Sequence, residues 1–301
     1  MKALVTGADG LVGSRFVELE ERLELVTPTE QELDVTKPNQ IREFLEREKP
    51  DWVIHFAAYT NVEKAQEEQK ELAYKVNYIG TKNLIGICNE LKIKLMYLST
   101  DHVFPGEGMY IEDDKQKPVN YYGETKFLGE QAIMAAGSNW LLIRTSYPYR
   151  AEFANKKDVV RTILEKLQNK ESVELVVDQA VTPTFIDDLV IGISKLVRDN
   201  QVGIYHISGR DCLSFYDMGK ILCEVFDLDY NLIKGTTLQE FMTKYNKKAP
   251  QPKKSCMNSN KFQKNTMMIM PDFREGVIKM KTQLSPVKEI NVTNVGGASA
   301  D

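Results

Sequence analysis

Several features that mark common classes of protein are missing from this sequence. No stretch of its 301 residues reaches the roughly 18–20 apolar residues needed to span a bilayer. The opening MKALVTGADG enters a strand-like run without the apolar segment of a signal peptide. Lys and Arg number 39 against 43 Asp and Glu, and this net charge of −4 argues against a general nucleic-acid binder. We therefore expect a cytoplasmic protein that partners neither a membrane nor a nucleic acid.

Metal-binding and redox patterns are equally scarce. The three histidines, His55, His102 and His206, lack the spacing of metal ligands, and no metal site is predicted. No CxxC pair occurs, and we expect reduced, mainly structural thiols at four widely separated positions: Cys88, Cys212, Cys223 and Cys256. The basic cluster KYNKKAPQPKK at 244–254 contains proline and is typical of a solvated loop.

The first half of the chain alternates short β-rich runs with helical periods. Several of these runs are almost continuously apolar, as strands are when helices cover both faces of a parallel sheet. This alternation predicts an α/β, doubly wound parallel (Rossmann) sheet. The expected strands are KALVT (2–6), LELVT (23–27), DWVIHFAA (51–58), KLMYLST (94–100) and WLLIRTS (140–146).

The second half is less regular and predicts a smaller, α-rich C-terminal lobe that binds the substrate. We assign 1–145 and 172–207 to the dinucleotide-binding domain, because SVELVV (172–177) and GIYHI (203–207) resemble further strands. Residues 146–171 and 208–291 form the expected substrate lobe. The small, polar tail at 292–301 is expected to be disordered.

A glycine-rich segment, TGADGLVG, follows the first strand and opens the first helix. Gly7, Gly10 and Gly13 have a GxxGxxG spacing, which permits a tight turn and lets the backbone approach a pyrophosphate at the helix N-terminus. The segment, including Leu11 and Val12, is therefore predicted to bind a dinucleotide.

The choice between the two nicotinamide cofactors is less constrained by the sequence. The end of the second strand carries Thr27-Pro28-Thr29 where an acidic residue would contact the adenosine ribose. The lack of a carboxylate favours NADP(H), with NAD(H) as the other option, because nothing there repels a 2′-phosphate. Arg15 would then supply positive charge or be a solvent-facing helix residue.

A tyrosine and a lysine begin the helix after the fourth strand. In NYYGETK, Tyr122 and Lys126 are four residues apart and share a helix face, whereas Tyr121 and Lys126 do not. A nearby ammonium group moves the pKa of a tyrosine toward the working range. Thr100, or failing that Ser99, ends the fourth strand and would hold a substrate carbonyl. This predicts proton transfer by Tyr122, with hydride supplied by a nicotinamide.

In motif order and spacing, the chain resembles the extended short-chain dehydrogenase/reductases and, within them, the dTDP-4-dehydrorhamnose reductases. The matching segments run almost end to end: TGADGLVG, LDVTKP, HFAAYTNVEKAQ, YKVNYIGTKNL, LSTDHVFPG, YGETKFLGE, IRTSYPY, DQAVTPTFIDDL and PDFREGV. The resemblance implies NAD(P)H-dependent reduction of a 4-keto group on a nucleotide-linked deoxyhexose. The partner would be that nucleotide sugar, and a homodimer is one assembly to test.

The resemblance also implies roles for individual residues. Thr100, Tyr122 and Lys126 would form the catalytic triad. Cofactor contacts beyond the glycines, Tyr122 and Lys126 would come from Asp34, Val35, Ala57, Ala58 and Tyr59. Substrate contacts would come from Thr100, Asp101, His102, Tyr122 and Tyr147.

Two positions depart from the family pattern, and both border the expected sugar pocket. His102 replaces the tyrosine of STDYVFDG and would be a sugar contact or a packed loop residue. Tyr147 replaces the tryptophan of RTSW and would stack on the sugar or belong to the core. These departures leave the identity of the sugar open.

Two alternatives share the fold. Dehydratases of this type place two acidic residues after the threonine that ends the fourth strand. This chain has one acidic residue there, Asp101, followed by His102, so dehydration is disfavoured over reduction. An epimerase remains an option. The regulatory subunit of methionine adenosyltransferase resembles the same family, binds NADP and works as a binding partner. The complete triad favours an enzyme.

Overall fold

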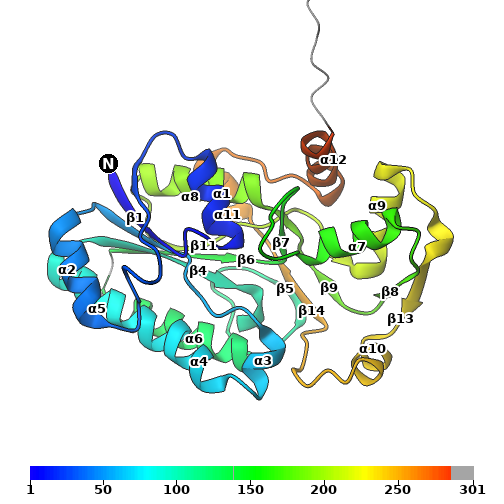
Figure 1. Cartoon of the computed structure of the whole chain (residues 1–301), viewed down its shortest axis with the longest axis horizontal. Helices are drawn as coiled ribbons and strands as arrows, with labels where there is room; N and C mark the ends of the chain where they lie inside the picture. The colour runs from blue at the N-terminus through cyan, green and yellow to red at the C-terminus, as the bar shows by residue number, and fades with distance from the viewer. Residues whose placement is uncertain (138, 286–301) are drawn as a thin grey trace, which may run out of the picture.

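A six-stranded parallel sheet forms the centre of the larger lobe. The computed structural model (Figure 1) describes residues 1–137 and 139–285, so the expected tail at 292–301 lies outside the described residues. The strand order β11-β6-β4-β3-β1-β2 confirms the doubly wound parallel fold. The strands are β1 (Lys2–Thr6), β2 (Glu24–Val26), β3 (Trp52–His55), β4 (Lys94–Thr100), β6 (Trp140–Thr145) and β11 (Gly203–His206).

Helices cover both faces of this sheet (Figure 1), as its apolar strands require. One face carries α1 (Leu11–Leu19), α8 (Ile186–Arg198) and α11 (Asn260–Thr266). The other carries α2 (Pro38–Glu48), α3 (Val62–Gln66), α4 (Lys70–Tyr74), the π-helix η1 (Lys75–Gly80), α5 (Thr81–Leu91) and α6 (Tyr121–Met134). Within residues 1–137 and 139–285, no helix has the length and apolar character to cross a membrane.

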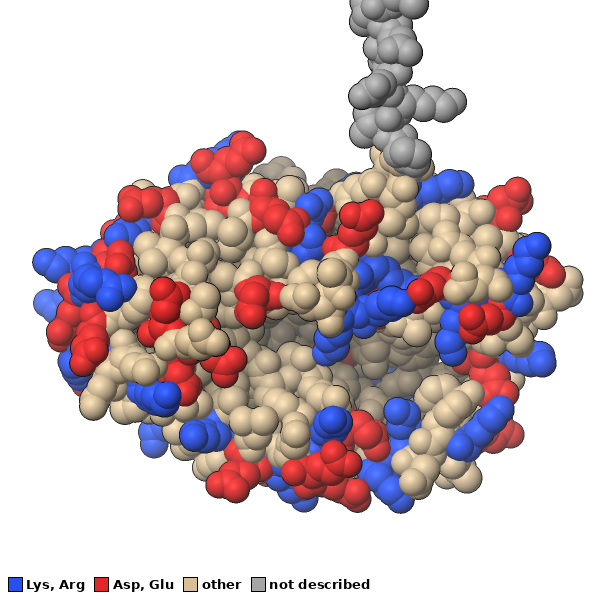
Figure 2. Space-filling model, viewed as in Figure 1, with Lys and Arg blue, Asp and Glu red and all other residues tan. Residues whose placement is uncertain are grey.

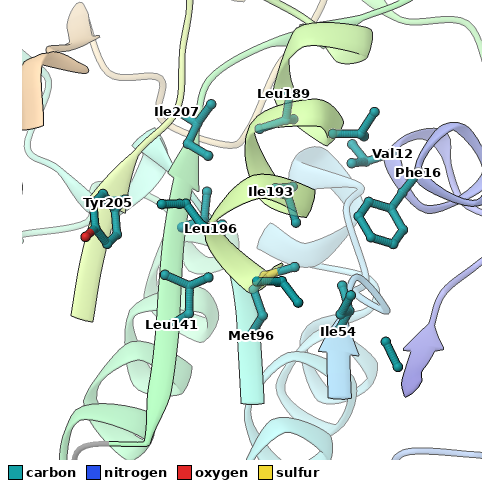
Figure 3. Packing of buried hydrophobic residues seen from close by; sticks show 14 of the residues in the cluster. Val12, Phe16, Ile54, Met96, Leu141, Leu189, Ile193, Leu196, Tyr205 and Ile207 are labelled. Atoms are coloured by element: carbon teal, nitrogen blue, oxygen red, sulfur yellow. The ribbon is translucent and has the colours of Figure 1, made fainter. Parts of the chain in front are cut away.

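Figure 3 shows the apolar layer between the sheet and the first helical face. Leu189, Ile193 and Leu196 project from α8 toward Met96 and Leu141 of the sheet. The three α8 side chains recur at helical spacing, so one stripe of the helix is fully buried. This packing holds the carboxyl ends of β1, β3, β4 and β6 at one edge of the sheet.

The smaller lobe has its own core, built from helices and one strand pair. Strand β8 (Val173–Val176) pairs with β13 (Ile233–Thr236), not with the six-stranded sheet. The assignment of 172–177 to the dinucleotide-binding domain is therefore wrong for this strand, because its apolar side chains pack against the lobe's helices. The other elements are α7 (Val159–Gln168), α9 (Phe215–Phe226), η3 (Tyr230–Leu232), α10 (Leu238–Lys244) and α12 (Phe273–Leu284). The assignment of 208–291 to the substrate lobe is also wrong for α11, because its Phe262 is buried in the core of the six-stranded sheet. The other lobe boundaries stay a prediction.

Short strands join the two lobes. Strand β7 (Pro148–Tyr149) pairs with β10 (Thr184–Phe185), and a four-stranded sheet has the order β12-β9-β14-β5. Its strands are β5 (Glu107–Tyr110), β9 (Ala180–Val181), β12 (Leu213–Ser214) and β14 (Lys254–Met257), and the 3₁₀ turn η2 (Asp101–Val103) packs against β14.

The expectation of reduced thiols is wrong for one pair of cysteines. Cys212 and Cys256 form a disulfide although 44 residues separate them. Cys212 directly precedes β12 and Cys256 lies in β14, strands that both pair with β9, and the two Cα atoms are 5.5 Å apart, which suits a disulfide. Cys88 and Cys223 are free and buried, as the helical patterns predicted.

Candidate active site

The glycine-rich segment forms a tight turn between β1 and α1. Gly7 has φ +69°, and a Cβ there would lie 2.6 Å from the backbone nitrogen of Ala57. A Cβ on Gly13 would lie 2.1 Å from the carbonyl oxygen of Gly7. These approaches explain why glycine occupies both positions. Gly10 is the N-cap of α1 and makes no side-chain cap bond, so the free N–H groups of the first turn can face an anion.

This turn lies where the strand order reverses between β1 and β3, which is where open α/β sheets bind ligands. Ala57 and Ala58 follow β3 directly, and the Tyr59 N–H donates to Asn77 Oδ1 at 2.7 Å. Next to this edge, Val35 is buried against Gly80. Asp34 accepts hydrogen bonds from Thr36, which lower the pKa of its carboxyl against the opposing effect of burial.

Arg15 is neither a free positive charge for a 2′-phosphate nor a solvent-facing residue, the two roles that the sequence suggested. Its guanidinium donates to both carboxylate oxygens of Asp187 on α8, each at 2.7 Å, and also to Glu18. The charge of Arg15 is therefore compensated within the protein and fastens α1 to α8. A 2′-phosphate gains no unpaired charge from this side chain.

The three residues of the expected triad come from adjacent elements. Thr100 ends β4, and Tyr122 and Lys126 lie one turn apart at the start of α6. All three side chains are buried. Lys126 Nζ donates to the carbonyl oxygen of Leu98 at 2.8 Å and lies 4.0 Å from the ring centroid of Tyr97. The packing of α6 on β4 thus brings the hydroxyl, phenol and ammonium groups to one edge of the sheet.

Burial changes the acidity of both ionisable members. It raises the pKa of Tyr122 well above its ordinary value; the Thr100 hydroxyl opposes this rise and the Asp101 charge adds to it. It lowers the pKa of Lys126 to about 7, with Glu130 opposing. Tyr122 is therefore protonated at neutral pH, the form that a proton donor needs, while Lys126 is balanced between its charged and neutral forms.

His102 and Tyr147 lie beside Tyr122. The His102 ring stands edge-on to Tyr122 with 5.5 Å between centroids, and it lies 6.3 Å from the Tyr147 ring. Tyr147 also packs edge-on against Phe215 of the smaller lobe and has φ +41°. A bulky residue with positive φ is strained, and such strain is concentrated at functional sites.

A cavity of about 700 Å³ begins at Tyr147 and extends into the smaller lobe. Aromatic rings on its wall include Phe215, Phe241 and Tyr245, and its charged residues are four lysines and two glutamates: Lys166, Lys234, Lys244, Lys247, Glu63 and Glu174. Figure 2 shows the hollowed face of the molecule, with Lys and Arg side chains bordering the hollow. The basic segment at 244–254, interpreted from sequence as a solvated loop, thus contributes to a cavity wall.

Two hydroxyls near the triad are buried without a partner among the described residues: Ser99 Oγ and Thr145 Oγ1. Thr145 is the register partner of Thr100 on the neighbouring strand. An unpaired buried hydroxyl lowers the stability of the protein by about 1–3 kcal/mol. A ligand that hydrogen-bonds to this hydroxyl removes that penalty, which adds to the free energy of binding. With the uncapped first turn of α1, this orphaned Thr145 hydroxyl fits a bound nicotinamide cofactor at this edge.

Comparison with known proteins agrees with this geometry. The family described as the RmlD substrate binding domain matches residues 1–285. The chain belongs to that family. It is 29% identical over 282 residues to dTDP-4-dehydrorhamnose reductase of Mycolicibacterium smegmatis, covering 92% of this chain and 84% of that protein.

Two further relatives of this RmlD-family chain have informative descriptions. The dTDP-4-keto-6-deoxy-D-glucose reductase of Streptomyces niveus is 32% identical over 231 residues, which is 75% of this chain and 79% of that protein. The crystal structure of dTDP-4-dehydrorhamnose reductase from Bacillus anthracis in complex with NADP superposes with a TM-score of 0.86. It is 29% identical and covers 94% of this chain and 99% of that one.

Asn77 is a site residue that sequence reasoning missed in this RmlD-family chain. It lies in the π-helix η1 and is fully buried. Its amide accepts from Tyr59 N–H and donates to the Tyr59 carbonyl at 3.0 Å and to Thr125 Oγ1 at 3.0 Å. It therefore ties the loop after β3 to the helix turn that carries Lys126. The stretch 71–92 is amphipathic and carries many polar residues, so nothing in the local sequence distinguished Asn77 from them.

Proposed function

We propose that this RmlD-family chain reduces the 4-keto group of a deoxyhexose linked to a nucleoside diphosphate. The first conversion to test is dTDP-4-dehydro-rhamnose to dTDP-rhamnose, with NADP(H) as the favoured cofactor and NAD(H) as the other option. One observation supports this most: Thr100, Tyr122 and Lys126 lie at the edge of the sheet that carries the glycine turn, and His102 links them to Tyr147, where a cavity of about 700 Å³ begins. The names of the relatives and the NADP in the B. anthracis structure agree with it.

The cavity has the chemistry that a nucleoside diphosphate requires. Its aromatic rings offer faces for a base, and its lysines outnumber its glutamates, which favours a diphosphate. Lys244 is already paired with Glu174 at 2.6 Å. Lys166, Lys234 and Lys247 are therefore the residues that we assign to the phosphates.

The protein's own residues account for the proton and the orientation of the carbonyl. The Thr100 and Tyr122 hydroxyls would both donate hydrogen bonds to the keto oxygen, and Tyr122 would then transfer its proton to that oxygen. Lys126 in its charged form stabilises the phenolate that remains. Gly7, Gly10, Gly13, Ala57 and Ala58 would hold the dinucleotide, which supplies the hydride when bound.

Substitution of the two adjacent tyrosines separates this role from general packing. Tyr122→Phe should lower kcat about 10²–10⁴-fold because it removes the proton donor, while the variant still binds NADPH. Tyr121→Phe is the matched control, since the Tyr121 backbone N–H, not its phenol, bonds to Gln66. The measurement is NADPH oxidation with a panel of 4-keto deoxyhexose nucleotides. A Tyr122→Phe variant with undiminished turnover would disprove the assignment.

The same assay distinguishes the alternatives. A protein that binds NADP but oxidises none with any sugar nucleotide, and that changes the kinetics of a co-purifying enzyme, would be a regulatory subunit. A product inverted at a hydroxyl-bearing carbon without net NADPH consumption would identify an epimerase. Size-exclusion chromatography with light scattering tests the homodimer.

A further inference from the structure

His102 is held by a side-chain amide whose orientation the backbone determines. Asn120 is the N-cap of α6, and its Oδ1 accepts a hydrogen bond from Gly123 N–H at 2.9 Å. Its Nδ2 donates to the carbonyl oxygen of Pro250 at 2.9 Å. A flipped amide would place two donors together at Gly123 and two acceptors together at Pro250. Only one orientation of the Asn120 amide is therefore compatible with both neighbours.

This orientation determines where His102 carries its proton. The same Asn120 Nδ2 lies 2.9 Å from His102 Nδ1, and both residues are buried. An NH₂ group has no acceptor capacity, so Nδ1 must accept the hydrogen bond and must be unprotonated. The neutral imidazole consequently carries its hydrogen on Nε2. A charged imidazolium would direct an Nδ1–H at the amide hydrogens.

The Nε2–H group remains available to a ligand. In residues 1–137 and 139–285, no group hydrogen-bonds to His102 Nε2. Unlike the buried Ser99 and Thr145 hydroxyls, this nitrogen keeps some surface that solvent can reach. The ring itself is fixed between Tyr122 and Tyr147, at centroid distances of 5.5 Å and 6.3 Å. A rigid N–H donor therefore reaches accessible space beside the proposed proton donor.

We infer that Asn120 is a positioning residue that holds His102 as an Nε2–H donor, so that His102 recognises an oxygen acceptor on the sugar. The inference rests on the proposed function for its ligand. It has a consequence for specificity: His102 favours a hydroxyl or carbonyl oxygen and rejects an ammonium group at the same place, because two donors would face each other.

Asn120→Asp reverses the polarity of this contact and leaves the helix cap intact. Aspartate caps helices as well as asparagine does, so Oδ1 still accepts from Gly123 N–H. The second carboxylate oxygen would then face His102 Nδ1 and draw the proton to that nitrogen. It would also oppose the Pro250 carbonyl oxygen, so urea unfolding must show that the variant is folded before its spectrum is compared. Asn89→Asp is the matched control, because Asn89 lies on the exposed end of α5 and its side chain donates, within the described part of the chain, to the Ala136 carbonyl oxygen alone.

Nitrogen NMR of histidine-labelled protein tests the tautomer directly. The chain has three histidines, and burial holds the pKa of His55 and of His206 at about 3, so these two are neutral. At pH 7.5 we expect His102 to show an acceptor-type Nδ1 and a protonated Nε2, assigned by their loss in His102→Gln. Asn120→Asp should protonate Nδ1, and Asn89→Asp should change nothing. A wild-type His102 with a proton on Nδ1 overturns the inference whether or not the protein is a reductase.

Kinetics test the contact with the sugar. His102→Phe should raise KM for the sugar nucleotide about tenfold, which corresponds to one hydrogen bond, with little change in the Kd for NADPH. His102→Gln keeps an N–H donor and should remain within about threefold of wild type. Equal KM values for wild type and His102→Phe would overturn the sugar contact. Absence of reductase activity in the wild type would instead contradict the proposed function and leave the NMR result to decide the tautomer.

Discussion

Gly13 and Gly86 both lie inside helices, and we expect opposite effects when each is replaced by alanine. Helix propensity alone favours alanine by about 1 kcal/mol at either position. At Gly86, in α5, a Cβ would have nothing within 4 Å, so the full gain should appear. At Gly13, in α1, a Cβ would lie 2.1 Å from Gly7 O and 3.1 Å from Ala8 Cα.

The magnitude at Gly13 follows from what the new methyl group meets. Both neighbouring atoms belong to the backbone of the glycine-rich turn, so no side chain can rotate away. Overpacking of this kind costs about 1–3 kcal/mol, and the helical gain offsets only part of it. Because the helical gain is common to both variants, we expect their free energies of unfolding to differ by the overpacking cost alone, about 1–3 kcal/mol. Movement of the turn should also weaken NADPH binding at least tenfold in Gly13→Ala alone.

Urea unfolding followed by tryptophan fluorescence measures this difference. The two tryptophans, Trp52 and Trp140, lie in β3 and β6, so their emission reports on the lobe that contains both glycines. Fluorescence titration with NADPH gives the Kd for each variant. A Gly13→Ala protein as stable as Gly86→Ala, with unchanged NADPH affinity, would refute the reasoning.

Three further predictions concern buried polar groups. Because burial lowers the pKa of Lys126 from 10.5 to about 7, the unfolded chain binds more protons between these values, and the free energy of unfolding should rise with pH across that window. Lys126→Met should lose this rise, and parallel urea midpoints for the two proteins would contradict it. Glu130→Gln should lower the free energy of unfolding by about 3–5 kcal/mol, because it leaves the charge of the fully buried Arg144 unpaired. The control Glu90→Gln breaks an exposed pair and should lower it by under about 1 kcal/mol. Similar urea midpoints for the two variants would refute the difference. Thr145→Val should be at least as stable as wild type, because it removes a buried hydroxyl that has no partner among the described residues. The variant should nevertheless bind NADPH or the sugar nucleotide less tightly. Lower stability with unchanged Kd and KM would show a structural role instead.

The larger lobe could be predicted from local patterns because its strands and helices are determined by neighbouring residues. Continuous apolar runs became β1, β3, β4 and β6, and Pro38 begins α2 as expected. The segment 172–177 did form a strand, but its apolar residues fit either lobe equally well. Its pairing with β13 depends on a segment about 60 residues later, which no local pattern specifies.

The candidate site shows the same division. The sequence by itself determined the glycine turn, the hydroxyl at the end of β4 and the placement of Tyr122 and Lys126 one turn apart on α6, because turn geometry and helical spacing act over a few residues. Only the tertiary structure decided the pairing of Arg15 with Asp187, the Cys212–Cys256 bond and the Asn120 amide that orients His102. Each joins elements far apart in the chain, and its partners are set by how the helices and strands pack.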